Sequence, residues 1–330
     1  LLGSQTAKAK REMHRRVAGG EVDLLIGTHA LIQGGVEIPR LAMAVVDEQH
    51  RFGVMQRASL REKGERPHLL AMSATPIPRS LALTLYGDLD ISLLDELPPG
   101  RQEIETKWIH PERRANAYEL LRRQVTQGRQ AFVICPLIEE SDTLQTRAAT
   151  TEHQRLSAEV FPDLSLGLLH GRMPLKEKEE IMEQFRRGET DILVSTPVIE
   201  VGIDIPNASI ILIEGADRFG LAQLHQFRGR VGRGKYHSYC LLMTDSHSGQ
   251  AMERLQIMER VTDGFAVAEE DLQFRGPGDF FGTRQSGLPD LRIARLSDHD
   301  LLALARKEAS TLLRKDPYLE LPQHAALAKE

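Results

Sequence analysis

Short apolar runs rich in β-branched residues alternate with longer amphipathic segments along the middle of this chain. Runs such as Ala131–Cys135 and Ser209–Ile213 are typical of strands, and each intervening segment has the composition of a helix. Parallel neighbours in a sheet need a crossover long enough to hold a helix. The alternation therefore predicts βαβ units and an α/β fold built on parallel sheets. We expect strands at residues 104–109, 131–135, 165–169, 191–195, 209–213 and 236–243, and helices at 112–127, 143–160, 175–187 and 222–231.

The N-terminal part of the chain shows the same alternation. We expect helices at residues 6–17, about 52–63 and 76–86, and strands at 22–26, 41–46 and 68–72. The apolar run Leu41–Val46 predicts a strand that is buried on both faces. The whole pattern is that of two parallel-sheet lobes joined by a short hinge.

The segment Leu97-Pro98-Pro99-Gly100-Arg101 separates the two alternations, because paired prolines and a glycine break both helix and strand. We therefore expect the first lobe at residues 1–97 and the second lobe at 98–245. Residues 246–290 predict a helical pair, at 250–261 and 265–274, followed by a glycine-rich loop at 275–285. Residues 291–330 predict an amphipathic helical tail.

The composition excludes several classes of protein. Of the 330 residues, 41% are hydrophobic and 27% charged, as in globular domains. Cys135 and Cys240 are too few for a disulfide framework, and both lie in or beside apolar runs, where reduced thiols are expected. No run approaches the roughly 20 apolar residues of a membrane span, and we expect a cytoplasmic protein. The formal net charge of −5 means that contacts with DNA must come from local basic patches.

Two adjacent carboxylates, Asp47 and Glu48, directly follow the expected strand at residues 41–46. In parallel α/β sheets, ligands bind at the carboxyl ends of the strands. Two neighbouring carboxylates repel each other, so the pair makes chemical sense beside a cation. Asp47 could hold Mg²⁺ through its water shell while Glu48 orients a water for attack on a phosphate. The alternative is a strand that ends in solvated charge.

The segment Gln226-Phe227-Arg228-Gly229-Arg230-Val231-Gly232-Arg233 interleaves arginine with glycine. Arg230 and Arg233 are three residues apart, so on a helix they project from one face. Two guanidinium groups held close together repel unless an anion lies between them, and a triphosphate suits their fork geometry. Across a cleft from Asp47 and Glu48, they would act as arginine fingers. The alternative is a solvated basic helix end.

Small polar residues follow several of the expected strands. Amides and hydroxyls at such positions can hold the phosphates of a nucleic-acid strand without reading its bases. Any one of these positions alone is better explained as an ordinary turn or helix cap, and their recurrence on strand ends favours the functional interpretation. The residues are Thr28, His29, Ser73, Thr75 and Thr196.

Together these motifs occur in the order of the superfamily 2 helicases, and the sequence resembles the RecG family of branch-migration helicases among them. The resemblance extends from near residue 1 to about Gly287. It rests on Gly27-Thr28-His29, Asp47–Val54, Ser73-Ala74-Thr75, Leu97–Arg101, Ile138–Ser141, His170-Gly171-Arg172, Ser195–Asp204 and Gln226–Arg233. The segment Glu269–Gln285 resembles a translocation element that RecG shares with the transcription-repair coupling factor. A coupling-factor-like translocase is the nearest alternative, although Gln49 departs from the carboxylate motif of that family.

The resemblance implies two RecA-like lobes, of which the first is truncated in this chain. It also implies a monomeric motor that binds ATP and Mg²⁺ and acts on branched double-stranded DNA and single-stranded DNA. Asp47 would hold Mg²⁺ and Glu48 would be the catalytic base. The nucleotide would be sensed or contacted by Arg230, Arg233, Gln226, Gly202, Asp204, Gln49 and His50. Contacts with DNA and coupling would involve Thr28, His29, Ser73, Thr75, Arg172, Thr196, Arg254, Arg275 and Gln285.

A motor of this kind also needs a phosphate-binding loop of the form G-x-x-x-x-G-K-[ST]. The near match Gly229–Lys235 is followed by Tyr236, lacks the Mg²⁺-binding hydroxyl and overlaps the arginine motif, so we reject it. In the family, the phosphate loop and a DNA-gripping wedge domain precede the position where this chain begins. We therefore expect a C-terminal part of a longer protein that is inactive alone. A catalytically inactive DNA-binding relative is the second alternative, and the intact Asp47–Glu48 pair favours the motor.

Overall fold

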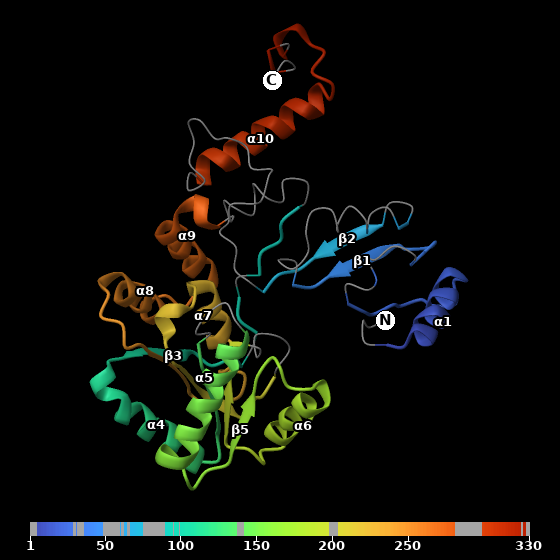
Figure 1. Ribbon diagram of the computed structural model, residues 1–330. Coiled ribbons are helices and arrows are strands. Elements are labelled where there is room, and N and C mark those ends of the chain that lie inside the picture. The colour runs from blue at the N-terminus through green and yellow to red at the C-terminus, as the bar shows by residue number, and fades with distance from the viewer. Residues whose placement is uncertain are drawn as a thin grey trace. The chain divides into compact units, whose positions relative to one another are not determined.

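The chain divides into two compact units, Leu1–Thr75 and Pro76–Glu330, which are shown in Figure 1. The computed structural model describes residues 5–28, 31, 36–48, 60, 63–64, 67–74, 90–94, 96–98, 100–136, 142–197, 204–280, 299–324 and 326–327. The expected linker Leu97–Arg101 belongs to the second unit, where the Arg101 amide donates to the Pro98 carbonyl at 3.2 Å and closes a turn. The domain boundaries expected at residues 97, 245 and 290 stay predictions.

The N-terminal unit contains one helix and a small parallel sheet. Helix α1 spans Ala7–Ala18, and the hydroxyl of Thr6 accepts a hydrogen bond from the Ala9 amide at 3.3 Å, as expected of an N-cap. Strands β1 (Met43–Val46) and β2 (His68–Ala71) pair in parallel, with Val46 beside Ala71. The helix predicted at 6–17 and the strands predicted at 41–46 and 68–72 are thereby confirmed.

Two expectations for this unit are wrong. Residues 22–26 do not form a strand, and Leu24 and Ile26 are 78% and 76% exposed. β1 is covered on one face only, since Ala44 and Val46 are buried while Val45 is 55% exposed. A strand forms where a partner supplies hydrogen bonds and a packed layer removes its side chains from water. Among the described residues of this unit, β1 and β2 pair only with each other, so an apolar composition alone did not determine either outcome.

The C-terminal unit is built on a six-stranded sheet in the order β3-β8-β7-β4-β6-β5, with every neighbouring pair parallel. Each predicted strand after residue 100 is present, within a few residues at its ends, and the α/β prediction with parallel sheets is confirmed. The strands are β3 (Ile104–Ile109), β4 (Gln130–Ile134), β5 (Leu166–Leu169), β6 (Ile192–Ser195), β7 (Ala208–Ile213) and β8 (Ser238–Met243).

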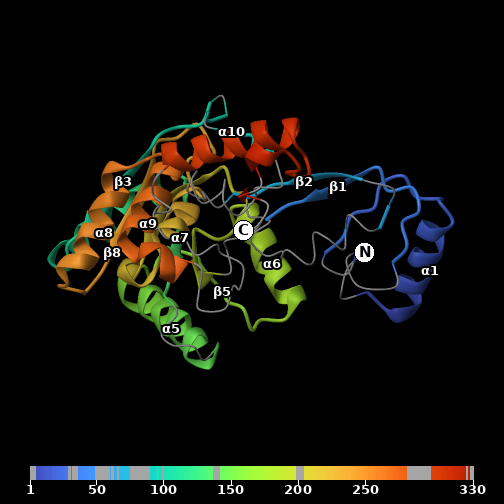
Figure 2. The same cartoon turned by 90° about the horizontal axis from the view of Figure 1, so that it is seen from above.

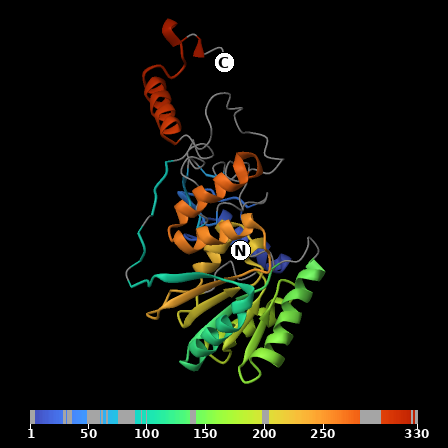
Figure 3. The ribbon, with the colours of Figure 1, turned by 90° about the vertical axis from the view of Figure 1, so that its left-hand side faces the viewer.

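Helices cover both faces of this sheet (Figure 3). Alternate residues of β4 point to opposite faces: Ala131 and Val133 pack in the core beneath α4 and α5, whereas Phe132 and Ile134 pack in the core beneath α6, α7, α8 and α9. The helices are α4 (Arg114–Thr126), α5 (Asp142–Arg155, continued by a π-helical turn, Leu156–Val160), α6 (Leu175–Arg186), α7 (Leu221–Arg228), α8 (Gly249–Arg260), α9 (Gly264–Phe280) and α10 (His299–Lys315). No helix in the described ranges is long and apolar enough to cross a membrane.

Two helix ends differ from the prediction. The helix expected at 222–231 ends at Arg228, and Gly232 adopts the left-handed conformation with φ of 75°, which few residues other than glycine adopt. Conversely, α9 continues to Phe280 through Pro277, where a loop was expected from Arg275 onward. A proline inside a helix removes one backbone hydrogen bond, but local propensity is a weak prior that tertiary packing overrides. Helices α7, α8 and α9 lie side by side, as Figures 1 and 2 show.

Both cysteines are free and buried, as predicted. Burial raises the pKa of the Cys240 thiol to about 12, and it raises the pKa of Cys135 as well. A thiolate is the reactive form of cysteine, so both thiols are expected to be inert in the folded protein.

Candidate functional site

The carboxylate pair lies where β1 ends. β1 stops at Val46, whose carbonyl accepts a hydrogen bond from the Met72 amide at 2.7 Å. Asp47 and Ser73 therefore emerge at the same edge of the small sheet. The Glu48 amide donates to Asp47 Oδ1 at 2.9 Å, and Glu48 has a φ of 53°. A left-handed conformation is uncommon outside glycine and is often found at functional sites.

The chemistry of Asp47 and Glu48 fits a Mg²⁺ ion at Asp47, with Glu48 beside it. Mg²⁺ in phosphate-transfer sites is held by one or two carboxylates, by water and by the phosphates themselves. Asp47 is exposed and Glu48 is half-buried, so the two carboxylates differ in access to solvent. Within the described ranges, no group of three or more His, Cys, Asp or Glu residues could hold a metal. Gln49, His50, His29 and Thr75 lie outside the described residues.

Arg233 and Asp204, predicted separately as nucleotide contacts, meet in the C-terminal unit. Arg233 Nη1 lies 3.2 Å from Asp204 Oδ1, and Arg233 Nε donates to the Gly229 carbonyl at 3.0 Å. The Arg233 side chain is 30% exposed and the Asp204 side chain 66% exposed. Arg230 is half-buried in the turn after α7. Because α7 ends at Arg228, Arg230 and Arg233 project from this turn and not from one face of a helix, which corrects the geometry expected from their spacing.

The segment Gly229–Lys235 runs from the end of α7 towards β8. A phosphate-binding loop of the P-loop type connects a strand to a helix, with the helix N-terminus facing the phosphates. The order here is the reverse, and this agrees with the rejection of the segment as a P-loop. Gln226 lies half-buried within α7, one turn before this segment, and Gly202 lies outside the described residues.

Arg228, from the same motif, has a different role from its neighbours. Its side chain is buried, with 4% of the residue exposed, and it donates to the carbonyls of Met258, Val261 and Thr262 at 3.0, 2.8 and 2.9 Å. Arg228 Nη2 also lies 2.7 Å from His225 Nδ1. Burial, with a further contribution from the Arg228 charge, lowers the pKa of His225 to about 4. These carbonyls belong to the last turn of α8 and the residues after it, so Arg228 joins α7 to the helical pair.

Arg254 makes the reciprocal connection. It lies on α8, and its guanidinium donates to the carbonyls of Asp217, at 3.3 Å, and Phe219, in the segment that leads into α7. Arg254 is therefore half-buried against this segment and does not lie on a solvated face of α8. Sequence reasoning missed Arg228, although its position beside the apolar Phe227 places it towards the core side of α7.

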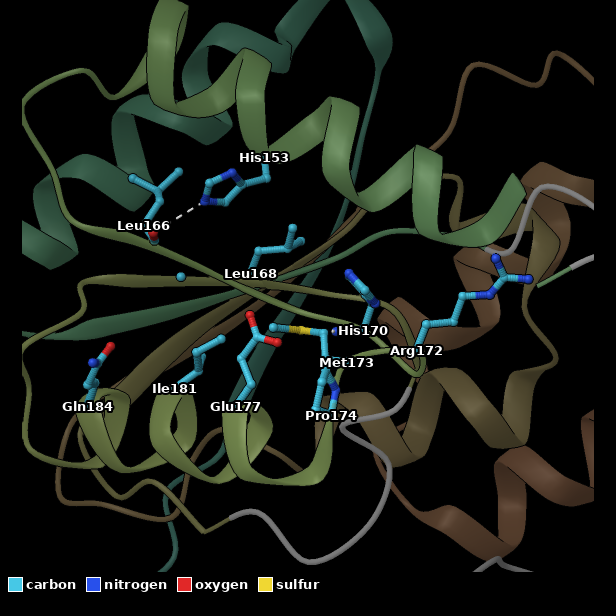
Figure 4. A pocket seen from close by; sticks show the side chains of 11 residues that line it. His153, Leu166, Leu168, His170, Arg172, Met173, Pro174, Glu177, Ile181 and Gln184 are labelled. Atoms are coloured by element: carbon cyan, nitrogen blue, oxygen red, sulfur yellow. Dashed lines mark hydrogen bonds between the residues drawn. The ribbon is translucent and has the colours of Figure 1, made fainter. Parts of the chain in front are cut away.

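A pocket of about 510 Å³ lies beside the edge strand β5, between α5 and α6 (Figure 4). His153 of α5 lies 3.2 Å from the Leu166 carbonyl of β5, and Ile181 and Gln184 of α6 line the opposite side. His170 and the exposed Arg172 follow the carboxyl end of β5, and burial lowers the pKa of His170.

The remaining residues predicted to contact DNA are placed as follows. Thr28 and Ser73 are exposed, whereas Thr196 is buried, with 3% exposed. A contact between the Thr196 side chain and DNA would require its hydroxyl to be uncovered. Arg275 lies in the last part of α9, and Gln285 falls outside the described residues.

An ionic network around the buried Glu214, at the carboxyl edge of the large sheet, was not anticipated. Glu214 follows β7 and accepts hydrogen bonds from Arg114 Nη1 at 2.8 and 2.9 Å. Burial raises the pKa of Glu214, and the Arg114 charge opposes that rise. Tyr118 and Asp245 complete the cluster, with Arg114 Nη2 3.2 Å from Asp245 Oδ1. These contacts fix the start of α4 against the ends of β7 and β8.

Family models match most of the chain. Residues 2–84 match the DEAD/DEAH box helicase family, residues 112–235 the helicase conserved C-terminal domain, and residues 261–330 the model described as ATP-dependent DNA helicase RecG, domain 3, C-terminal. The first model includes the carboxylate motif, and the second includes the arginine motif. The third begins directly after α8 and covers all of α9 and the tail.

Individual relatives agree with the third model. The ATP-dependent DNA helicase RecG of Synechocystis sp. is 56% identical over 321 residues, which is 97% of this chain and 39% of the relative. RecG of Bacillus subtilis is 47% identical over 331 residues, or 100% of this chain and 48% of the relative. This chain has a RecG-type sequence over nearly its whole length. It spans between 39% and 49% of the length of the curated RecG proteins that it matches.

Two solved structures are also similar to this chain. A RecG bound to a three-way DNA junction superposes with a TM-score of 0.67 and 46% sequence identity, covering 92% of this chain and 39% of that one. The helicase Mss116p bound to single-stranded RNA gives a TM-score of 0.57 at 17% identity, covering 79% of this chain and 55% of that one. The second likeness concerns the fold alone.

Proposed function

We propose that the protein containing this chain is an ATP-driven DNA translocase that unwinds branched DNA. The observation that carries the proposal is 45–56% identity to RecG helicases over nearly the whole chain, with the carboxylate pair and the arginine motif both present. A RecG relative has been solved on a three-way DNA junction, which supports branched duplexes as the substrate. We further propose contacts with single-stranded DNA, action as a monomer, and a cytoplasmic location, where bacterial DNA is accessible.

In this proposal, the two motifs act on one ATP molecule when the two lobes close. Glu48 orients and deprotonates the attacking water, and Asp47 would hold a Mg²⁺ ion, which would supply positive charge to the phosphates when bound. Arg230 and Arg233 approach the γ-phosphate and stabilise the charge of the transition state. Asp204 engages Arg233 at 3.2 Å, so nucleotide binding would exchange one anionic partner of this arginine for another.

Movement would reach DNA through the helical pair. The arginine turn, residues 229–233, continues directly from α7. Arg228 of α7 donates to carbonyls at the end of α8, and Arg254 of α8 donates to a carbonyl just before α7. A displacement of the arginine turn on hydrolysis would therefore carry α8 and α9 with it. Hinge-type transitions of this kind convert a local change at phosphate into motion of a packed element. Thr28, Ser73, Arg172 and Thr196 would hold the DNA backbone during the cycle.

The proposal is tested by Glu48→Gln in the full-length gene product that contains this chain. Glutamine keeps the size of the side chain but cannot accept the proton of the attacking water. We expect ATP binding to be retained and DNA-dependent ATP hydrolysis to fall roughly 10²–10⁴-fold, the usual effect of losing a general base. Glu179→Gln, at an exposed position on α6, is the matched control. Wild-type hydrolysis in Glu48→Gln would contradict the assignment.

The coupling role of the helical pair is tested separately. Arg254→Ala and Gln285→Ala should keep most of the DNA-dependent ATPase activity and lose most junction unwinding, because neither residue belongs to the nucleotide motifs. The measured quantity is the number of base pairs unwound per ATP hydrolysed. An unchanged ratio in both variants would remove the helical pair and its loop from the mechanism.

A further inference from the structure

The turn that carries the arginine fingers is held in place by a residue far away in the sequence. The Gly229 carbonyl lies just beyond the last residue of α7, where no amide of the helix is available to it. Two arginines donate to this one oxygen: Arg233 through Nε at 3.0 Å, and Arg101 through Nη2 at 3.3 Å. Arg101 closes the turn that begins at Pro98, at the end of the expected linker.

The same stretch also supports the other end of the turn. Gly232 packs so closely on the start of β3 that a Cβ atom there would lie 2.7 Å from Ile104 Cγ1 and 3.4 Å from the Gln102 carbonyl oxygen. Between these supports, Val231 is fully buried in the core. Residues 101–104 therefore contact the arginine turn at both of its glycines, and the backbone from Gly229 to Gly232 has little freedom to move independently of them.

Within the described part of the chain, positive charge is concentrated around Gly229. Two guanidinium groups share one carbonyl oxygen, and the nearby carboxylate, that of Asp204, is largely exposed and contacts Arg233. Burial lowers the pKa of Arg101, and the charge of Arg233 lowers it further. An anion arriving at Arg233 would relieve the repulsion, so this arrangement favours phosphate at the position where the arginine fingers need it.

We propose that Arg101 is a positioning residue for ATP hydrolysis, which holds the Gly229 peptide so that Arg233 is aimed at the γ-phosphate. Arg101 shares its acceptor with the Nε atom of Arg233, while Nη1 of Arg233 contacts Asp204 Oδ1. Its effect is therefore exerted through Arg233 and not through direct contact with the nucleotide. Because Arg101 ends the segment Leu97–Arg101, the orientation of the arginine turn also depends on the conformation of that segment. The inference rests on the proposed function, since it assumes that Arg233 contacts phosphate.

The test is a double-mutant cycle in the full-length gene product, with steady-state ATPase kinetics measured on branched DNA. The variants are Arg101→Ala, Arg233→Ala and the double variant, together with Arg101→Lys and a control, Arg123→Ala, at an exposed position on α4. A misplacement of about 1 Å can reduce a rate by roughly 10²-fold. We therefore expect Arg101→Ala to lower kcat by about 10- to 100-fold, with the KM for ATP changed less than about threefold. Arg101→Lys, which keeps one donor and the charge, should recover part of the loss.

The decisive result is the behaviour of the double variant. If Arg101 acts through Arg233, adding Arg101→Ala to Arg233→Ala causes no further loss of kcat, because the group being positioned is already absent. Equal losses in both backgrounds, or a loss expressed mainly in the KM for ATP, would overturn the proposal, since they indicate general destabilisation or direct nucleotide contact. Wild-type kinetics in Arg101→Ala would overturn it too. Normal ATPase activity in Arg233→Ala would instead refute the proposed function of the arginine motif, and so the two failures are distinguishable. Thermal melting and DNA binding of each variant verify that it is folded.

Discussion

Replacing Arg228 with methionine is expected to loosen the helical pair from the sheet. Methionine keeps an unbranched stem of similar length in the core but has no donors, so the carbonyls of Met258, Val261 and Thr262 lose their partner. The contact with Met258 is buried, whereas the other two are partly accessible to water. The change therefore tests whether a buried cation whose hydrogen bonds, among the described residues, go to carbonyls and to His225 stabilises this unit.

The magnitude follows from these contacts. A buried acceptor left without a donor costs about 1–3 kcal/mol, and a partly solvated one costs less because water can replace the lost donor. Against this, removing Arg228 also removes the unfavourable burial of its charge, which is visible as a lowered pKa. We expect the free energy of unfolding of the C-terminal unit to fall by about 2–3 kcal/mol, or roughly 2–4 °C in Tm for each kcal/mol.

Urea denaturation followed by tryptophan fluorescence measures this change. Trp108 is the single tryptophan of the chain, and its amide donates to Glu259 of α8 at 2.5 Å, so it reports on this unit and on α8. The matched control is Arg260→Met, which replaces an exposed arginine at the end of α8. Its free energy of unfolding is expected to change by no more than about 0.5 kcal/mol. Hydrogen exchange should accelerate in α8 and α9 more than in β4 and β7. A loss below about 1 kcal/mol, or one no larger than that of the control, would refute the reasoning.

Three further predictions concern the chain by itself. Residues 1–330 should show no DNA-stimulated ATPase activity above background in a phosphate-release assay, because the sequence contains no acceptable phosphate loop; measurable turnover would mean that its phosphate site has been misidentified. The pKa of His225 falls from 6.5 to about 4 on folding, so between these values the unfolded state binds more protons. The free energy of unfolding should then decrease as pH falls through that window, by at most about 1.4 kcal/mol per pH unit from this residue. His225→Gln should flatten the slope measured by urea denaturation, and an identical slope would exclude the contribution. Gly232→Ala should cost about 2–4 kcal/mol by the same assay, from the left-handed backbone and the contact with Ile104, and a loss under 1 kcal/mol would show that the turn adjusts.

The elements of the C-terminal unit follow closely from local sequence patterns. The glycines after α4 and α6, Gly128 and Gly188, adopt φ values of 79° and 75° and were expected helix ends. The strands β4, β6 and β7 are buried at every position and apolar except for Gln130, Ser195 and Ser209, which is why composition located them. In the N-terminal unit the same rules failed at residues 22–26, because a strand depends on partners that a local pattern does not reveal.

The candidate site was predicted more completely in residue identity than in geometry. The carboxylate pair and the arginine motif were located from residue types and from their place after expected strands or helices. The meeting of Asp204 with Arg233 was not predicted, nor was the burial of Arg228. A short-range pattern shows that an arginine is present, but it cannot show which carbonyl or carboxylate, tens of residues away, will lie beside it.

The sequence alone therefore determined the α/β class, the order of the strands along the chain and the residues able to carry phosphate chemistry, because these depend on composition and spacing within a few residues. Tertiary structure decided how the three arginines of one motif are divided: Arg228 is buried against the end of α8, whereas Arg230 and Arg233 occupy the turn. It also placed Arg101 on the Gly229 carbonyl, a contact between residues 128 positions apart. Such a contact arises only when the packed core brings the start of β3 beside the end of α7. A hydrogen bond depends on the distance between donor and acceptor in space, and their separation along the sequence does not reveal that distance.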